Sequence, residues 1–337
     1  MKETEGSLAI HKKRQIFKIG ICLVVLITGM ILSLGMGAVD YTVPEIFHHL
    51  LERSQTTDRL ILRDVRLPRT LVAAVVGMCL SVSGAIMQGI TRNPMASPSV
   101  LGVTNGASLV TLILFAFFPT AASFTPIAAV TGAFLTTMLI YGAAWKGGVA
   151  PVRFILSGVA VSSVLSAIYS VISTLYPDAI VGMIGFNVGS LQARTWHHLQ
   201  LLLPYAVVGL TASLFFTNRL NILAMGDEVA KGLGVSVESI RLILIVISSI
   251  LAGSAVSVVG QIAFVGLCMP HITRMLVGSD YRYLLPASAI NGASMVVYCD
   301  LAARLVIKPQ EMEVGIIIAV IGAPFFLYLL RKKVSSI

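Results

Sequence analysis

Long apolar runs alternate with short polar ones along almost the whole chain. A helix that crosses a bilayer needs about 17–25 predominantly apolar residues, and the pattern predicts ten such helices. A further apolar run, residues 179–191, is shorter and holds three glycines, so we expect a re-entrant or interfacial helix there and not a span. The ten predicted spans are residues 19–39, 71–90, 100–118, 122–144, 154–175, 199–217, 241–260, 262–277, 284–306 and 314–330.

One compact polar stretch, about residues 218–241, separates two of these spans. Its sequence is NRLNILAMGDEVAKGLGVSVESIR, in which charged residues stand among small ones. The glycines at 232 and 234 predict a short helix, a tight turn and the start of a second helix. Such a polar segment does not stabilise a bundle in lipid, so we expect a cytoplasmic partner to bind it. An ordinary solvated loop is the alternative interpretation.

Composition sets the class of protein. Hydrophobic residues make up 56% of the chain, charged residues 12%, and the mean hydropathy is +0.91, whereas roughly 25% of residues are charged in a soluble domain. The chain is therefore predicted to be an all-α, multi-pass protein of the cell membrane. A basic tail, residues 1–18, precedes a single transmembrane domain, residues 19–333.

The basic residues predict how the chain is oriented. The even number of spans places both termini on one side, and Lys and Arg near span ends tend to stay in the cytoplasm. With the N-terminus inside, sixteen of the 24 lysines and arginines fall inside. We therefore expect both termini to be cytoplasmic. The same bias explains the net charge of +9, so no nucleic-acid partner is expected.

Five of the eight outside basic residues precede the second span in one segment: Arg53, Arg59, Arg63, Arg66 and Arg69. Acidic residues nearby balance them, so a self-neutralised surface loop is one interpretation. The other is that Arg66 and Arg69 offer guanidinium forks to carboxylates of an extracellular partner. Arg304 should emerge on the same face, although Asp300, four residues earlier, predicts a structural ion pair with it.

Candidate chemistry is sparse. The four cysteines lie singly in apolar spans, and no His, Cys and carboxylate spacing fits a metal. The chain has no phosphate-binding G-x-x-x-x-G-K-[ST] motif, so we expect no ATP hydrolysis, no cofactor and no enzyme activity from this chain. Asp300 is the one acidic residue well inside a span, which disfavours an ion-coupled transporter.

The approach to the third span is interrupted by Pro94, Pro98 and Gly102. These residues predict a broken entry to the helix. Irregular backbone at membrane depth must be buried in protein or line a cavity. That arrangement is typical of a translocation path, although a simple turn fits the same residues.

Five motifs together carry a resemblance to a known family. They are RLPR at 66–69, SGAIMQGITRNPMASPSVLGVTNGAS at 83–108, LNILAMGDEVAKGLGV at 220–235, GQIAFVGLCMPHITRMLVG at 260–278 and GIIIAVIGAPFFLYLL at 315–330. The chain resembles, from about residue 20 to 332, the permeases of ABC importers for ferric siderophores, haem and cobalamin. The resemblance implies the ten-helix fold of the cobalamin importer permease, that of a type II importer. It also implies a second permease, two cytoplasmic ATPase subunits that use ATP, and a substrate-binding protein outside the membrane.

The resemblance also implies roles for residues. The polar stretch would form coupling helices that sit on the ATPase, and the binding protein would dock on Arg66, Arg69 and Arg304. The family's proline before the last span is Glu313 here, which makes Arg304 a weaker candidate than the other two. The implied ATPase contacts are Gly226, Asp227, Glu228, Ala230, Gly232, Leu233 and Gly234.

The path and its cargo are less defined. Candidate lining residues are Met87, Gln88, Asn93, Ser97 and Ser99, each of which could instead serve helix packing. A ferric siderophore is the expected cargo, with haem or cobalamin as alternatives, and the second permease can be an identical copy or a paralogue. An ion-coupled transporter, a membrane-embedded enzyme and a structural subunit without a path are the competing hypotheses.

Overall fold

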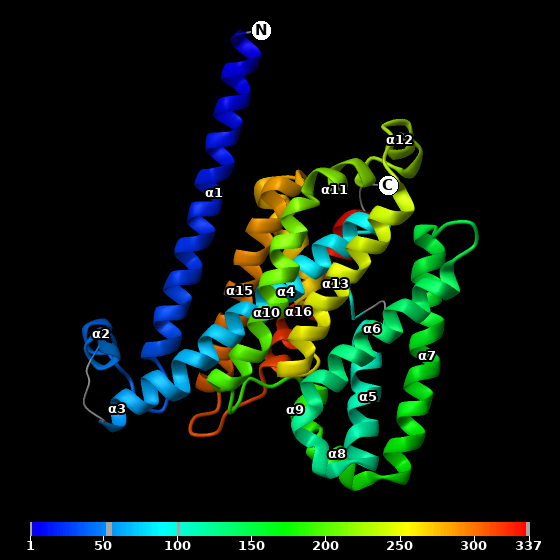
Figure 1. The fold of residues 1–337 in the computed structure, drawn as a ribbon. Coiled ribbons are helices and arrows are strands. Elements are labelled where there is room, and N and C mark those ends of the chain that lie inside the picture. Colours follow the sequence, from blue (N-terminus) through cyan, green and yellow to red (C-terminus); the bar gives the residue numbers. More distant parts are fainter. Residues whose placement is uncertain (1, 52–55, 100–101, 335–337) are drawn as a thin grey trace.

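The computed structural model describes residues 2–51, 56–99 and 102–334, and the regular structure in these ranges is helical (Figure 1). Arg53 and the first two residues of the predicted third span, 100–101, lie outside these ranges. Seven described helices are long and apolar enough to cross a membrane, and three shorter apolar helices complete the predicted ten. The ten are α1 (Lys2–Gly35), α4 (Leu67–Thr91), α5 (Val103–Phe117), α6 (Thr125–Ala144), α7 (Pro151–Leu175), α10 (Trp196–Phe215), α13 (Val237–Val259), α14 (Val265–Val277), α15 (Tyr281–Leu305) and α16 (Val314–Val334).

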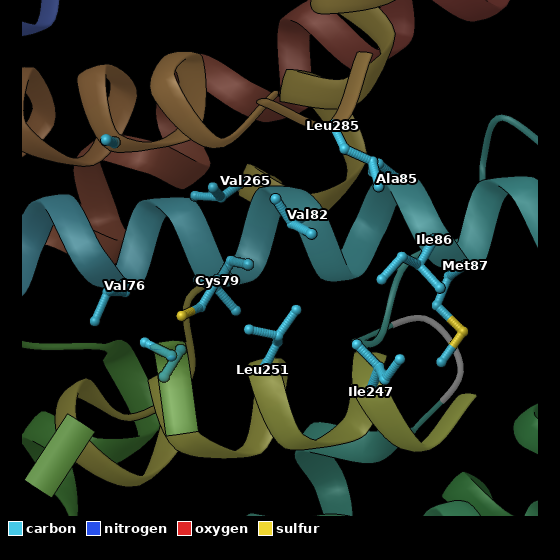
Figure 2. Packing of buried hydrophobic residues seen from close by; sticks show 14 of the residues in the cluster. Val76, Cys79, Val82, Ala85, Ile86, Met87, Ile247, Leu251, Val265 and Leu285 are labelled. Atoms are coloured by element: carbon cyan, nitrogen blue, oxygen red, sulfur yellow. The ribbon is translucent and has the colours of Figure 1, made fainter. Parts of the chain in front are cut away.

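Helix α4 forms the centre of the bundle and packs against α10, α13, α14 and α15. Its apolar side chains interdigitate with those of α13 and α14, as Figure 2 shows for Cys79, Leu251 and Val265. Glycine allows the closest approach, because a Cβ at Gly84 would overlap the carbonyl of Gly266. Close backbone contact of this kind gives helices dispersion energy in lipid, where burial of apolar surface contributes little.

Short helices gather at the two ends of the bundle. Helices α11 (Thr217–Ala224) and α12 (Asp227–Gly232) lie at the end of the bundle where α1 begins and α16 ends (Figure 1). The opposite end carries α2 (Val43–Leu51), α3 (Thr57–Leu60), the π-helix η1 (Ile61–Arg66), the 3₁₀-helix η2 (Pro119–Phe124), α8 (Pro177–Gly182) and α9 (Ile184–Val188). The described part of the chain therefore begins and ends at the same end of the bundle.

Two irregular segments agree with their predictions. The apolar run 179–191 folds as α8 and α9, six and five residues long, and both are too short to cross a bilayer. Helix α4 ends at Thr91 with Arg92 in the left-handed region at φ 51°, and α5 begins only at Val103 after Gly102 at φ 86°. The entry to the third span is thus broken, as its prolines indicated.

Candidate coupling segment and translocation face

The polar stretch folds as helix, turn and helix, which confirms the prediction for residues 218–241. Gly226 at φ 121° separates α11 from α12, and Gly234 at φ 74° turns the chain toward α13. A Cβ at Gly234 would meet open space, so glycine is favoured there by the backbone conformation and not by packing. We call residues 217–236 the coupling segment.

The predicted contact residues of this segment do not share one environment. Ala230 and Gly226 are buried against the protein, whereas Glu228, Gly232, Leu233 and Gly234 are exposed. A partner can therefore touch the exposed group, while Ala230 and Gly226 shape the segment from inside.

The exposed side also carries apolar residues that were not predicted. Met225 is 66% exposed, Val229 42% and Leu233 61%. Val229 and Leu233 are four residues apart on α12 and its C-terminal cap, a spacing that brings side chains to one side of a helix and could have identified Val229 from sequence. Met225 lies before the break at Gly226, so helical spacing gave no signal for it. Clustered exposed apolar side chains are typical of a surface that another protein covers.

Arg241, near the start of α13, holds the coupling segment from inside. Its side chain is buried and donates to both oxygens of Asp227 at 2.8 and 2.9 Å, to Glu238 Oε1 at 3.0 Å and to the Val149 carbonyl at 2.6 Å. Arg92, at the end of α4, lies 3.7 Å from Asp227. The carboxylate of Asp227, predicted as an ATPase contact, is thus already bound within the chain.

At the opposite end, Arg69 and Arg304 share one carboxylate. Arg69 donates to Asp300 at 2.9–3.1 Å and to Glu311 at 2.7 Å, and Arg304 Nε lies 3.3 Å from Asp300. Asp300 is fully buried, and both arginines are 7% exposed. The predicted ion pair between Asp300 and Arg304 is present, and Arg69 joins it from α4.

Arg66 and Arg304 also bind the last turn of α1. Arg66 donates to the carbonyls of Leu34 at 2.7 Å and Gly35 at 3.2 Å, while Arg304 donates to the Ser33 carbonyl at 3.0 Å. Carbonyls at a helix end lack hydrogen-bond donors within the helix, and these two guanidinium groups supply donors to them. In this structure the guanidinium groups of Arg66 and Arg69, which were expected to offer forks to carboxylates of an extracellular partner, are buried and bound within the chain. Docking by these arginines stays a prediction.

Two adjoining cavities lie along α5, α7, α9 and α16. The first measures about 280 Å³ and the second about 360 Å³, and they share Asn187 and Gln261. None of the described residues that line them carries a formal charge. The lining is Asn105, Ser108, Leu165, Ser166, Tyr169 and Ser170 in the first cavity, and Ser99, Thr104, Val188, Ile262, Ala263, Gly315, Ile316, Ala319 and Val320 in the second.

Amides and hydroxyls pair across the first cavity. Asn187 donates to the Tyr169 hydroxyl at 2.7 Å, Asn105 donates to the Ser166 hydroxyl at 3.3 Å, and Gln261 donates to Ser108. Polar side chains at membrane depth avoid lipid and face protein or water. The lining of the two cavities is our candidate for a translocation path, and we call it the translocation face.

The predicted path residues divide between the core and this face. Met87 is fully buried among apolar side chains (Figure 2), and Gln88 donates to the Leu267 carbonyl at 3.1 Å. Ser97 is buried and Asn93 half-buried, and neither is among the residues that line the two cavities; Ser99 lines the second. The structure thus brings only Ser99 of the five to the translocation face.

Sequence reasoning missed the residues that form most of this face. Ser166 and Ser170 stand four residues apart in α7, so they lie on one side of the helix, and that polar spacing was the available signal. Asn187 and Gln261 gave no such signal, because α9 and the residues before α14 are short and irregular.

Comparison with known proteins agrees with this architecture. The model of the FecCD transport family matches residues 24–332. The iron(3+)-hydroxamate import system permease protein FhuB of Bacillus subtilis (strain 168) is 42% identical over 93% of this chain and 82% of its own length. The Fe(3+)-citrate import system permease protein YfmD of the same organism is 40% identical over 93% of each chain.

A solved structure agrees as well. An inward-facing conformation of a metal-chelate type ABC transporter matches 93% of this chain and 98% of its own, with a TM-score of 0.84 and 29% identity. The family model alone covers far more than half of the sequence. This chain belongs to the FecCD transport family.

Proposed function

We propose that this chain is the permease subunit of an ATP-driven ABC importer that carries an iron(3+)–siderophore complex across the cell membrane. The observation that carries the proposal is the coupling segment, which places Met225, Val229 and Leu233 outward at one end of a membrane bundle. Relatives that match nearly the whole chain, FhuB and YfmD, are permeases of iron(3+)-hydroxamate and Fe(3+)-citrate import systems. The ten-helix fold and the family match support the same class.

The coupling segment would be the docking site of a cytoplasmic ATPase subunit. Its exposed residues would enter a groove of that subunit, with the apolar side chains of Met225, Val229 and Leu233 buried on contact. The backbone turn at Gly226 and the buried Ala230 would hold the segment in place. ATP would be hydrolysed by the partner, and both chain termini would lie on the same, cytoplasmic side.

The translocation face would line the path together with a second permease, an identical copy or a paralogue. An uncharged wall of hydroxyls and amides offers weak, exchangeable hydrogen bonds to a large polar chelate. Such a wall lets the cargo pass without a deep binding site, and it leaves selectivity to the binding protein. Met87, Gln88, Asn93 and Ser97 would shape the wall from behind, and Ser99 would face the cargo.

The binding protein would dock at the end that carries α2, α3, α8 and α9. Arg66, Arg69 and Arg304 remain the proposed docking residues. Of these, Arg69 can most readily exchange a partner, because its contact Glu311 has a side chain that is 39% exposed. Carboxylates of a binding protein would then replace Glu311 while Asp300 keeps Arg69 in place.

The test is uptake of radiolabelled iron in cells that lack this chain and carry it back on a plasmid. We expect the wild type to restore uptake of an iron(3+)-hydroxamate, and Leu233→Asp to abolish it at an unchanged level in the membrane. The matched control is Phe215→Asn, an apolar residue 84% exposed on α10 and outside the coupling segment, which should transport normally. Restored uptake of haem or cobalamin in place of the hydroxamate would overturn the proposed cargo.

A further inference from the structure

Arg241 contacts two segments that are separate in the sequence. It binds Asp227, the first residue of α12, through both carboxylate oxygens, and it binds the carbonyl of Val149 at 2.6 Å. Val149 belongs to the loop 145–150 that joins α6 to α7. One buried guanidinium group therefore links the coupling segment to the α6–α7 loop.

Glu238 strengthens the same link from the neighbouring turn of α13. Its Oε2 accepts from the Val149 amide at 3.0 Å, and its Oε1 accepts from Arg241 at 3.0 Å. Both backbone groups of Val149 are thus bound by the Glu238 and Arg241 pair. Because both its amide and its carbonyl are bound, Val149 should move together with Glu238 and Arg241.

The loop leads directly into the wall of the translocation face. Helix α7 begins at Pro151, two residues after Val149, and it carries Ser166 and Ser170 into the first cavity. Only 6% of the most apolar stretch of α7 is buried inside the subunit, so the contacts within this chain leave most of that stretch unburied and able to move. The α6–α7 loop lies at the same end of the bundle as α12 (Figure 1).

We infer that Arg241 is a positioning residue that makes α12 and the α6–α7 loop move together. A displacement of α12 would pass through Asp227 and Arg241 to Val149 and so to α7, which would open or narrow the translocation face. This inference rests on the proposed function, because it needs a partner that displaces α12. It assigns Asp227 to the transmission of movement within the chain and not to contact with the ATPase.

The experiment is performed on the complete importer, with ATPase, permeases and binding protein in proteoliposomes. ATP hydrolysis and uptake of an iron(3+)-hydroxamate are measured together, and their ratio is the readout. Arg241→Met should lower uptake per ATP by about fivefold or more, the lower limit of typical allosteric coupling, while hydrolysis continues. Arg282→Gln is the matched control, because Arg282 is an exposed arginine at the same end that pairs with Asp280, and its ratio should equal that of the wild type.

A second variant keeps the inference testable if Arg241→Met does not fold. Glu238→Ala leaves the Arg241 contact with Asp227 intact and releases the Val149 amide, so its ratio should also fall, to a lesser degree. An unchanged ratio in either variant, or a parallel loss of hydrolysis and uptake, would overturn the inference. Absence of ATP-dependent uptake by the wild type would contradict the proposed function itself, so the two failures can be told apart.

Discussion

Replacing Asp300 by alanine tests whether the buried arginines of α4 and α15 form a structural cluster. The carboxylate is fully buried and lies 2.9–3.3 Å from nitrogens of Arg69 and Arg304. Its removal leaves Arg69 with Glu311 alone and Arg304 with groups of α1. Breaking a buried ion pair from one side costs about 3–5 kcal/mol, because a charge stays buried without its partner. We expect a loss in this range for Asp300→Ala.

The assay is thiol labelling of the purified chain in mild detergent. All four cysteines are buried, so they react only when the structure opens. A loss of 3 kcal/mol corresponds to more than about a hundredfold faster labelling at 25 °C, provided that closing is faster than the thiol reaction. Glu311→Ala is the matched control, because Glu311 pairs with the same arginine at 2.7 Å but is part-exposed, and exposed pairs are worth about 0.2–1 kcal/mol. Equal labelling rates for the two variants would refute the reasoning.

Three further outcomes are expected. Gly84→Ala should destabilise the chain by at least about 1–3 kcal/mol, because its Cβ overlaps the Gly266 carbonyl, whereas Gly142→Ala meets nothing within 4 Å and should be tolerated; thermal unfolding in detergent compares the two. Leu233→Asp should leave that unfolding temperature unchanged, since the side chain is 61% exposed, and should abolish co-purification of the ATPase. Asp280→Ala should lower the free energy of unfolding by about 1 kcal/mol, because its carboxylate accepts a hydrogen bond from the Arg282 amide at the start of α15. Hydrogen bonds from the Arg282 side chain lower the pKa of Asp280 to about 2. The stabilisation is therefore full above the ordinary pKa of 3.8 and is lost as pH falls toward 2.

The apolar pattern predicted the positions of the ten apolar helices, of which seven, within the described ranges, are long enough to cross a membrane. It did not predict all of their ends. The span predicted to begin at residue 241 begins at Val237. Glu238 and Arg241 look like a polar boundary in the sequence, yet each finds its partner inside the protein, so the helix continues through them. Pairing with Asp227 and Val149 is a property of the fold, and no local pattern reveals it.

The candidate site, too, was only partly predictable from the sequence. The glycines of the coupling segment predicted its turns, because left-handed backbone needs glycine locally. The environment of Arg69 could not be predicted, since Asp300 is 231 residues away in the sequence and meets it only when α4 packs against α15. The translocation face likewise depends on α9 and the residues before α14, which have no periodic pattern.

ATP-dependent uptake in proteoliposomes tests the central claim most directly. The complete importer, reconstituted with its ATPase and binding protein, should accumulate an iron(3+)-hydroxamate only when ATP can be hydrolysed, and Leu233→Asp should remove that accumulation. Accumulation driven by a proton gradient, with the ATPase absent, would contradict the account and would establish an ion-coupled transporter in its place.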